Sequence, residues 1–199
     1  MPWSTLSLGP DRLLVLAAVS LSLTIGAPAG AAGRQSLRGH VPAVLKNLQP
    51  IDHVAASQRL GLAIGLPLRN SEGLDVLLQQ LYDPASPNYR QYLTPEQFAA
   101  MFGPTEDDYQ AVIDFVEANG LTVTATHPNR VVLDVEGAAR DIEAAFHVTM
   151  RVYQHPQEAR TFYAPDVEPS LDLTVPILHI SGLDNYALPH SRARLRPTP

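Results

Sequence analysis

A nine-residue stretch in which large and small residues alternate most constrains the fold of this chain. Leucine or isoleucine occupies every second position from 60 to 68, and glycine, alanine or proline fills the positions between them. A period of two predicts a β-strand that buries one face and presents small residues on the other. Pro67 cannot donate a ladder hydrogen bond, so it places the end of this strand at a sheet edge or a bulge.

The segments after this strand show further helical and strand periodicity. The patterns predict a helix ending at 82, helices at 95–102 and 106–119, strands at 121–125 and 131–135, a helix around 138–146, and strands at 148–153 and 160–164. This is the split βαβ order of elements. It predicts an α+β fold, a ferredoxin-like antiparallel sheet with helices on one face, together with an inserted helix pair.

The composition of the chain excludes several classes of function. The chain has 199 residues, 45% of them hydrophobic, which predicts a packed core rather than disorder. Its net charge is −6 and Lys46 is its single lysine, so we expect that the chain binds neither nucleic acid nor an anionic membrane surface. The absence of cysteine excludes thiol catalysis and thiolate zinc sites.

The N-terminal residues predict export. Arg12 precedes an apolar run from 13 to 27, and small residues follow it. The run is short for a membrane span, so residues 1–32 are predicted to be a cleaved signal peptide and the protein to be secreted; an uncleaved anchor is the alternative. Residues 33–57 then form a leader segment, 58–164 the core domain, and 165–199 an extended exit segment with a linker.

No catalytic constellation is present in the sequence. The seven histidines show no metal-binding spacing, so we interpret them as isolated surface or strand-end residues. The acidic triplet Glu106, Asp107 and Asp108 is better explained by a helix start, where the helix dipole favours anions. Ser181 has no positioned base nearby in sequence. We therefore expect no catalytic, cofactor-binding or metal-binding residues in this chain.

The exit segment leaves two interpretations open. Residues 171–183 are apolar and punctuated by prolines, which keep a chain extended. Such a segment can bind in a protease groove, or it can form a strand that closes the domain's own sheet. Further on, Arg192, Arg194 and Arg196 indicate an exposed, cleavable linker.

The run from Ser86 to Phe98 carries a family resemblance. Thr94 can cap a helix that begins at Pro95, and Gln97 stands at the capping-box position. This run and later motifs, in the same order along residues 58–186, resemble the activation propeptide of the sedolisin family, also called serine-carboxyl peptidases or kumamolisins. The residues that carry the resemblance are Tyr89, Tyr92, Leu93, Thr94, Phe98, Gly103, Asn119, Gly120, Phe146, Tyr163, Gly182 and Leu183.

The resemblance implies a function for the chain. Sedolisin propeptides share a ferredoxin-like core with subtilisin propeptides, assist the folding of a secreted endopeptidase, hold it inactive and are removed in acid. The catalytic Glu, Asp and Ser and the calcium site of the family belong to the catalytic domain, and no position here matches them. The implied partner is a sedolisin-type catalytic domain, in cis or in trans.

Alternatives remain at this stage. The chain is expected to be a fragment, a truncated product or a free-standing secreted inhibitor or protein-binding module, and the sequence does not choose between them.

Acid release is expected to depend on carboxylates paired across the interface, whose pairing is lost as they protonate. The candidate carboxylates are Glu106, Asp107, Asp108, Asp134, Glu136, Asp166 and Glu168.

Overall fold

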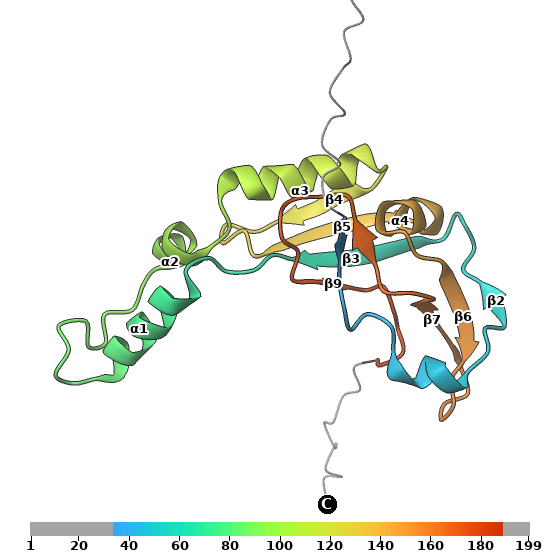
Figure 1. The fold of residues 1–199 in the computed structure, drawn as a ribbon, viewed down its shortest axis with the longest axis horizontal. Helices are drawn as coiled ribbons and strands as arrows, with labels where there is room; N and C mark the ends of the chain where they lie inside the picture. Colours follow the sequence, from blue (N-terminus) through green and yellow to red (C-terminus); the bar gives the residue numbers. More distant parts are fainter. Residues whose placement is uncertain (1–33, 189–199) are drawn as a thin grey trace, which may run out of the picture. The chain divides into compact units, whose positions relative to one another are not determined.

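The computed structural model describes residues 34–188, which form an α+β fold with antiparallel sheets (Figure 1), as the sequence predicts. The predicted signal peptide and the arginines of the predicted linker lie outside the described residues. In chain order the elements are β1 (Gln35–Ser36), the 3-10 helix η1 (Ala43–Asn47), β2 (Asp52–His53), β3 (Arg59–Gly65), α1 (Ser71–Tyr82), α2 (Pro95–Phe102), α3 (Glu106–Ala118), β4 (Thr122–Thr126), β5 (Val132–Ala138), α4 (Ala139–Phe146), β6 (Met150–Gln154), β7 (Thr161–Pro165), β8 (Ser170–Leu171) and β9 (His179–Ser181).

A four-stranded sheet with the order β4-β5-β3-β9 is the centre of the fold. Its central strand β3 is the segment of alternating residues, and its register places Ile64 opposite Leu133 on one side and Ile180 on the other. The alternation has the predicted result, because Leu60, Leu62 and Ile64 are at most 4% exposed. The large side chains of β3 therefore point into one core.

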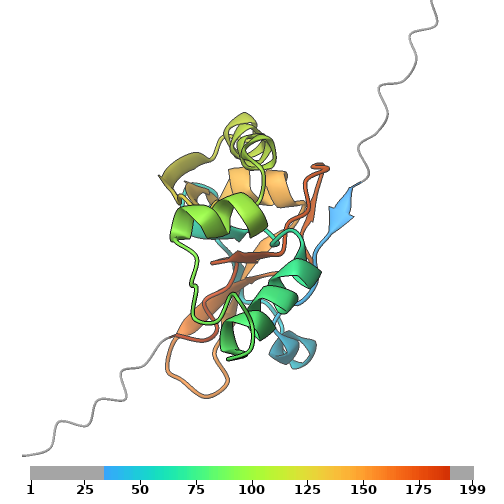
Figure 2. The same cartoon turned by 90° about the vertical axis from the view of Figure 1, so that its left-hand side faces the viewer.

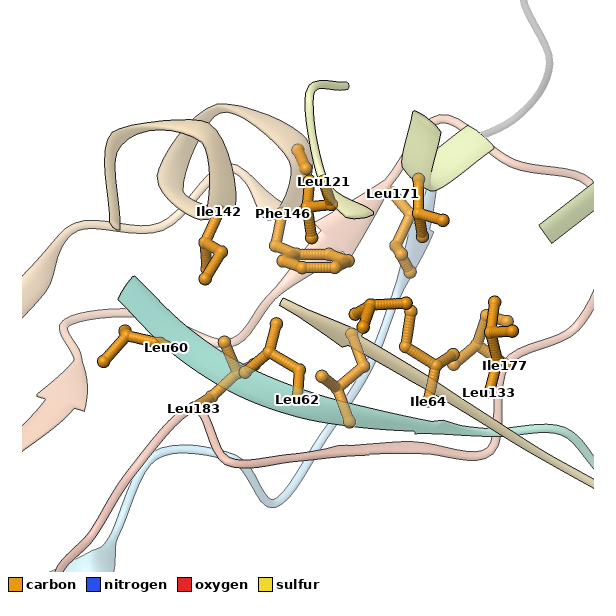
Figure 3. Close-up of a cluster of buried hydrophobic side chains, with 14 of the residues drawn as sticks. Leu60, Leu62, Ile64, Leu121, Leu133, Ile142, Phe146, Leu171, Ile177 and Leu183 are labelled. Atoms are coloured by element: carbon orange, nitrogen blue, oxygen red, sulfur yellow. The ribbon is translucent and has the colours of Figure 1, made fainter. Parts of the chain in front are cut away.

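Helices α3 and α4 cover this face of the sheet (Figure 1). The core between the helices and the sheet contains Val112 and Val116 from α3 and Ile142 and Phe146 from α4, and each of these side chains is at most 1% exposed. Figure 3 shows the ring of Phe146 and the side chain of Ile142 facing the leucines of β3. Burial of apolar surface on this face is the main source of stability.

The predicted strand at 148–153 forms, but in a different sheet from the one expected. It corresponds to β6, which pairs with β2 and β7 in a three-stranded sheet. The strand that pairs with the second edge of β3 is β9. The physical reason is local: β6 and β7 are joined by a short turn, so their pairing costs little loop-closure entropy, and the rings of Tyr153 and Phe162 stack across them at 5.5 Å.

The leader and the exit segment both pair with other parts of the described chain. In the leader, β1 pairs with β8 and β2 pairs with β6. The Gln35 side chain donates to the carbonyls of Leu173 and Val175 and accepts from the N–H of Ile177. In the exit segment, residues 179–181 close the domain's own sheet, which was one of the two interpretations the sequence left open.

Helices α1 and α2 lie beyond the end of the four-stranded sheet, and Figure 2 shows them from that side. The predicted capping box is present at the start of α2. The Thr94 hydroxyl accepts from the N–H of Gln97 at 3.2 Å, and the Gln97 side chain accepts from the N–H of Thr94 at 2.8 Å. Helix α3 begins at a similar cap, where Thr105 accepts from the N–H of Asp108.

Candidate docking face and exit segment

The second face of the four-stranded sheet is lined by small residues. Gly61, Ala63 and Gly65 alternate with the buried leucines of β3 and point to the side opposite α3 and α4. A methyl group added at Gly61 would meet no atom within 4 Å. A shallow hollow of about 360 Å³ lies on this face beside Ala63 and Ser181. We call this side of the sheet, from Gly61 to Gly65 with the residues paired to them, the open face.

Two carboxylates give the open face its charge. Asp134 and Glu136 of β5 pair in register with Ala63 and Gly61. His127 Nε2 lies 2.9 Å from the Asp134 carboxylate, and Arg59 Nε donates to Glu136 at 2.6 Å. Both carboxylates remain more than a third exposed. The open face therefore combines a backbone that another surface can approach closely with charged groups on the neighbouring strand β5.

The exit segment is fastened beside this face by a glycine. Gly182 has a φ of +94°, and a Cβ at this position would lie 2.4 Å from the Gly61 carbonyl oxygen. Only glycine fits both the left-handed conformation and this close approach. The Tyr163 hydroxyl donates to the Gly182 carbonyl at 3.3 Å, and Leu183 is 1% exposed in the core.

Further contacts hold the chain as far as Tyr186. The Asn185 side chain accepts from the N–H of Tyr163 at 2.6 Å, and the N–H of Asn185 donates to the Tyr163 carbonyl at 3.2 Å. The Arg160 guanidinium donates to the carbonyls of Asn185 and Tyr186. The Tyr186 ring stacks on His155 at 4.9 Å. The last described residues therefore leave the domain from a fixed position.

The residues that carry the family resemblance fall into three places in the structure. Tyr163, Gly182 and Leu183 lie in the contacts that hold the exit segment. Phe146 is fully buried under α4, while Asn119 and Gly120 end α3, where Gly120 has a φ of +78°. The others lie in or next to α2 and the loop before it: Tyr89, Tyr92, Leu93, Thr94, Phe98 and Gly103.

This third group borders an apolar groove between α1 and α2. Leu93 and Phe98 line the groove, which has a volume of about 320 Å³, together with leucines of α1. Tyr92 also lines it but is 64% exposed. Gly103 is buried at the end of α2. A side chain does not fit there, because a Cβ would lie 2.7 Å from the Asn129 carbonyl oxygen. The run from Ser86 to Phe98 thus shapes a surface groove and the start of a helix.

The seven candidate carboxylates are dispersed over the structure. Asp107 and Asp108 lie in the first turn of α3, as does Glu106, which is 3.7 Å from Arg130. Asp166 accepts from the N–H of Thr149 at 2.8 Å. Of the seven, Asp134 and Glu136 are the two that lie on the open face.

Glu168 is the candidate carboxylate with a distinct electrostatic environment. Burial acts to raise its pKa, but the backbone N–H groups of His40, Gly39 and Val41 together outweigh burial, so the pKa of Glu168 lies below its ordinary value. The carboxylate therefore ties the leader to the segment between β7 and β8 when it is ionised.

Sequence reasoning missed the burial of two histidines, His155 and, with more distant partners, His40. The sequence predicts His40 as an isolated surface or strand-end histidine, but it is 3% exposed and its ring stacks on His179 with centroids 4.3 Å apart. No periodic pattern surrounds it in the leader, so no signal in the sequence indicated that it would be buried. Its partners lie 128 to 140 residues further along the chain.

Within residues 34–188, no group of three or more histidine, aspartate or glutamate side chains is arranged to hold a metal ion. In the same residues, no helix has both the length and the apolar character needed to span a membrane.

These features define an α+β domain that completes its own sheet with the exit-segment strand β9, and residues 34–188 leave one face of that sheet uncovered. The family model described as "Pro-kumamolisin, activation domain" matches residues 46–186. The match covers most of the chain, so the chain belongs to this family, as the sequence motifs indicated.

Individual relatives agree with this assignment. The chain is 27% identical over 145 residues to Sedolisin of Pseudomonas sp. (strain 101) and 28% identical over 165 residues to Kumamolisin of Bacillus sp. (strain MN-32). It is 29% identical over 139 residues to Xanthomonalisin of Xanthomonas sp. (strain T-22). These matches cover 73%, 82% and 68% of this chain but 25%, 30% and 16% of the relatives, so the chain spans less than a third of each.

Proposed function

We propose that the chain is the propeptide of a secreted, acid-acting sedolisin-type endopeptidase, and that it serves as both folding chaperone and inhibitor of the catalytic domain. The observation that carries this proposal is the family match over residues 46–186 combined with the open face of the sheet. A sheet with one face covered by helices and the other lined by glycine and alanine can receive the backbone of another domain at close range.

The chaperone role follows from linkage. A surface that binds the folded catalytic domain and not its unfolded chain shifts the folding equilibrium toward the native state. The open face supplies that surface in this proposal, and its strand β5 carries Asp134 and Glu136 for pairing with cations of the partner. The same binding energy keeps the propeptide on the enzyme after folding.

Inhibition follows from the course of the exit segment. Contacts at Gly182, Asn185 and Tyr186 hold the chain in a defined direction as it leaves the domain. In this proposal the residues that follow Tyr186 pass along the substrate cleft of the docked catalytic domain and block it. Acid then weakens docking, because carboxylates paired across the interface have depressed pKa values in the complex and lose their pairing as pH falls through those values.

The test is inhibition of mature sedolisin-type catalytic domains by the full 199-residue chain. We expect inhibition near about pH 7 and release near about pH 4, where carboxylates become protonated. We also expect the chain to raise the refolding yield of the denatured catalytic domain. Inhibition that is undiminished in acid would remove the acid trigger, and an absence of both inhibition and assisted refolding would refute the proposal.

A matched pair of variants tests the open face directly. Ala63→Arg places a large side chain on the open face, beside Asp134, and Ala118→Arg makes the same change on the exposed end of α3. We expect Ala63→Arg to weaken inhibition by about 100-fold, the effect of a lost interface hot spot, and Ala118→Arg to leave it unchanged. Equal inhibition by the two variants would place docking elsewhere.

The alternative is a free-standing secreted inhibitor or binding module that acts in trans. The same assay separates the two, because a free-standing inhibitor would block a peptidase without raising the refolding yield of its catalytic domain.

A further inference from the structure

His40 joins the leader to the last strand of the central sheet. Its Nε2 accepts a hydrogen bond from the N–H of Ile180 at 3.0 Å, and its side chain is 1% exposed. Ile180 lies in the middle of β9, opposite Ile64 of β3. A side chain of the leader therefore contributes to holding β9, a strand of three residues at a sheet edge.

The hydrogen bond fixes the protonation state of the ring. Because a backbone N–H donates to Nε2, that nitrogen must carry a lone pair, and the proton of the neutral ring lies on Nδ1. Nδ1 is buried and has no hydrogen-bond partner among the described residues. The Glu168 carboxylate, held by the N–H groups of the leader, lies 3.7 Å from Nδ1.

Protonation of Nε2 is incompatible with this arrangement. A charged imidazole donates from both nitrogens, so the N–H of Ile180 would face another N–H instead of a lone pair. The charge would also be buried, and His179 stacks on the ring at 4.3 Å. The contact with Ile180 therefore stabilises β9 when His40 is neutral and destabilises β9 when His40 is protonated.

The groups around His40 act on its titration in both directions. Burial has the largest effect and lowers the pKa of His40, and His179 of β9 lowers it further. Two carboxylates act to raise the pKa of His40: Glu168, between β7 and β8, and Asp184, after β9. The backbone of Arg38 also acts to raise it, although it makes no hydrogen bond to Nδ1. The result is a pKa of His40 below its ordinary value.

The sign of the pH effect follows. The opened form binds a proton at the ordinary histidine pKa of 6.5, and the closed form does so at a lower pH. Stability of the closed form is therefore complete above that value and falls as pH decreases toward the depressed pKa. Loss of the Glu168 carboxylate acts in the same direction at lower pH, because its pKa in the closed form also lies below its ordinary value of 4.5.

We propose that His40 is an acid-sensitive latch: neutral His40 fastens β9 to the leader, and protonated His40 releases β9 and the part of the exit segment that follows it. The role of this opening in activating a peptidase rests on the proposed function. The opening itself is a property of this chain alone, so it can be measured without a peptidase.

The test is amide hydrogen exchange of Ile180 in the full chain, corrected for the intrinsic effect of pH. Between about pH 7.5 and about pH 5 we expect its protection to fall by about tenfold relative to the amide of Leu133 in β5, the effect of losing one hydrogen bond. His40→Gln places a non-titrating amide oxygen near the position of Nε2 and should abolish this fall. His127→Gln, a matched change at the margin of the open face, should retain it.

Two results would overturn the latch. One is an Ile180 protection that does not change with pH in the natural chain, and the other is a fall in Ile180 protection that persists in His40→Gln. If His40→Gln does not fold, nitrogen NMR of the imidazole in the natural chain decides: we expect the Nδ1–H tautomer near neutral pH and protonation in step with Ile180 exchange, and the opposite tautomer would refute the proposal.

The latch and the proposed function can fail separately. A latch that opens in acid in a chain that inhibits no sedolisin-type catalytic domain would refute only the proposed function. A chain that inhibits such a domain but shows pH-independent protection of Ile180 would refute only the latch.

Discussion

The two faces of the four-stranded sheet differ although the same strands build both. On the covered face, Leu62 and Ile64 pack under α3 and α4 and are nearly inaccessible. On the open face, Gly61 and Ala63 occupy the alternate positions of the same strand. The period of two therefore gives the two faces different properties: one face supplies the stability of the fold, and the other exposes its backbone.

The largest change in the free energy of unfolding is expected from Phe146→Ala on the covered face. Phe146 is fully buried beneath α4, and its removal leaves a cavity that the surrounding core fills incompletely. We expect a loss of about 3–5 kcal/mol in the free energy of unfolding, measured by urea denaturation. Phe146→Leu, which keeps most of the volume, is the control and should lose much less. A loss below about 1 kcal/mol for Phe146→Ala would show that this face is not the main source of stability.

A smaller effect is expected from Gly182→Ala, where the exit segment contacts the backbone of β3. The new Cβ would lie 2.4 Å from the Gly61 carbonyl oxygen, and alanine disfavours a φ of +94°. We expect a loss of about 1–3 kcal/mol in the free energy of unfolding, with the largest increase in hydrogen exchange at β9.

The control for this prediction is Gly39→Ala, which also has a positive φ but has no atom within 4 Å of an added Cβ. It isolates the cost of the backbone conformation from the cost of the contact. Equal losses in the two variants would show that the close approach to Gly61 contributes nothing.

Local patterns in the sequence predicted much of this fold. The alternation from 60 to 68 predicted β3 and the different character of its two faces. The capping box at Thr94 and the turn at 127–130 were also predicted correctly, because each depends on residues within a few positions of one another. These features are fixed by short-range chemistry, which is visible in the sequence.

The features that the sequence did not predict depend on distant partners. The pattern of 148–153 indicated a strand but not its neighbours, and β9, from the exit segment, pairs with β3 instead. The burial of His40 depends on Glu168 and Ile180, which come from the other end of the domain. Pairing over such separations is set by the whole fold, so local sequence patterns do not predict the environment of His40.

The smallest effect, and one of opposite sign, is expected from Gly61→Ala on the open face. An alanine side chain at this position meets no atom within 4 Å, and Gly61 has no positive φ that would strain it. The substitution restricts the unfolded chain more than the folded one, so we expect a gain of about 0.4–1 kcal/mol in the free energy of unfolding. The urea midpoint should rise with an unchanged slope.

The same variant sharpens the comparison of the two faces because stability and docking should separate in it. If a partner approaches the open face closely, the added methyl group stabilises the free chain and weakens inhibition of a sedolisin-type catalytic domain. A covered-face variant should instead lose stability and inhibition together. If Gly61→Ala is more stable and inhibits fully, the partner does not contact the backbone of β3 at this position, and the docking surface must be placed closer to Asp134 and the edge of β4.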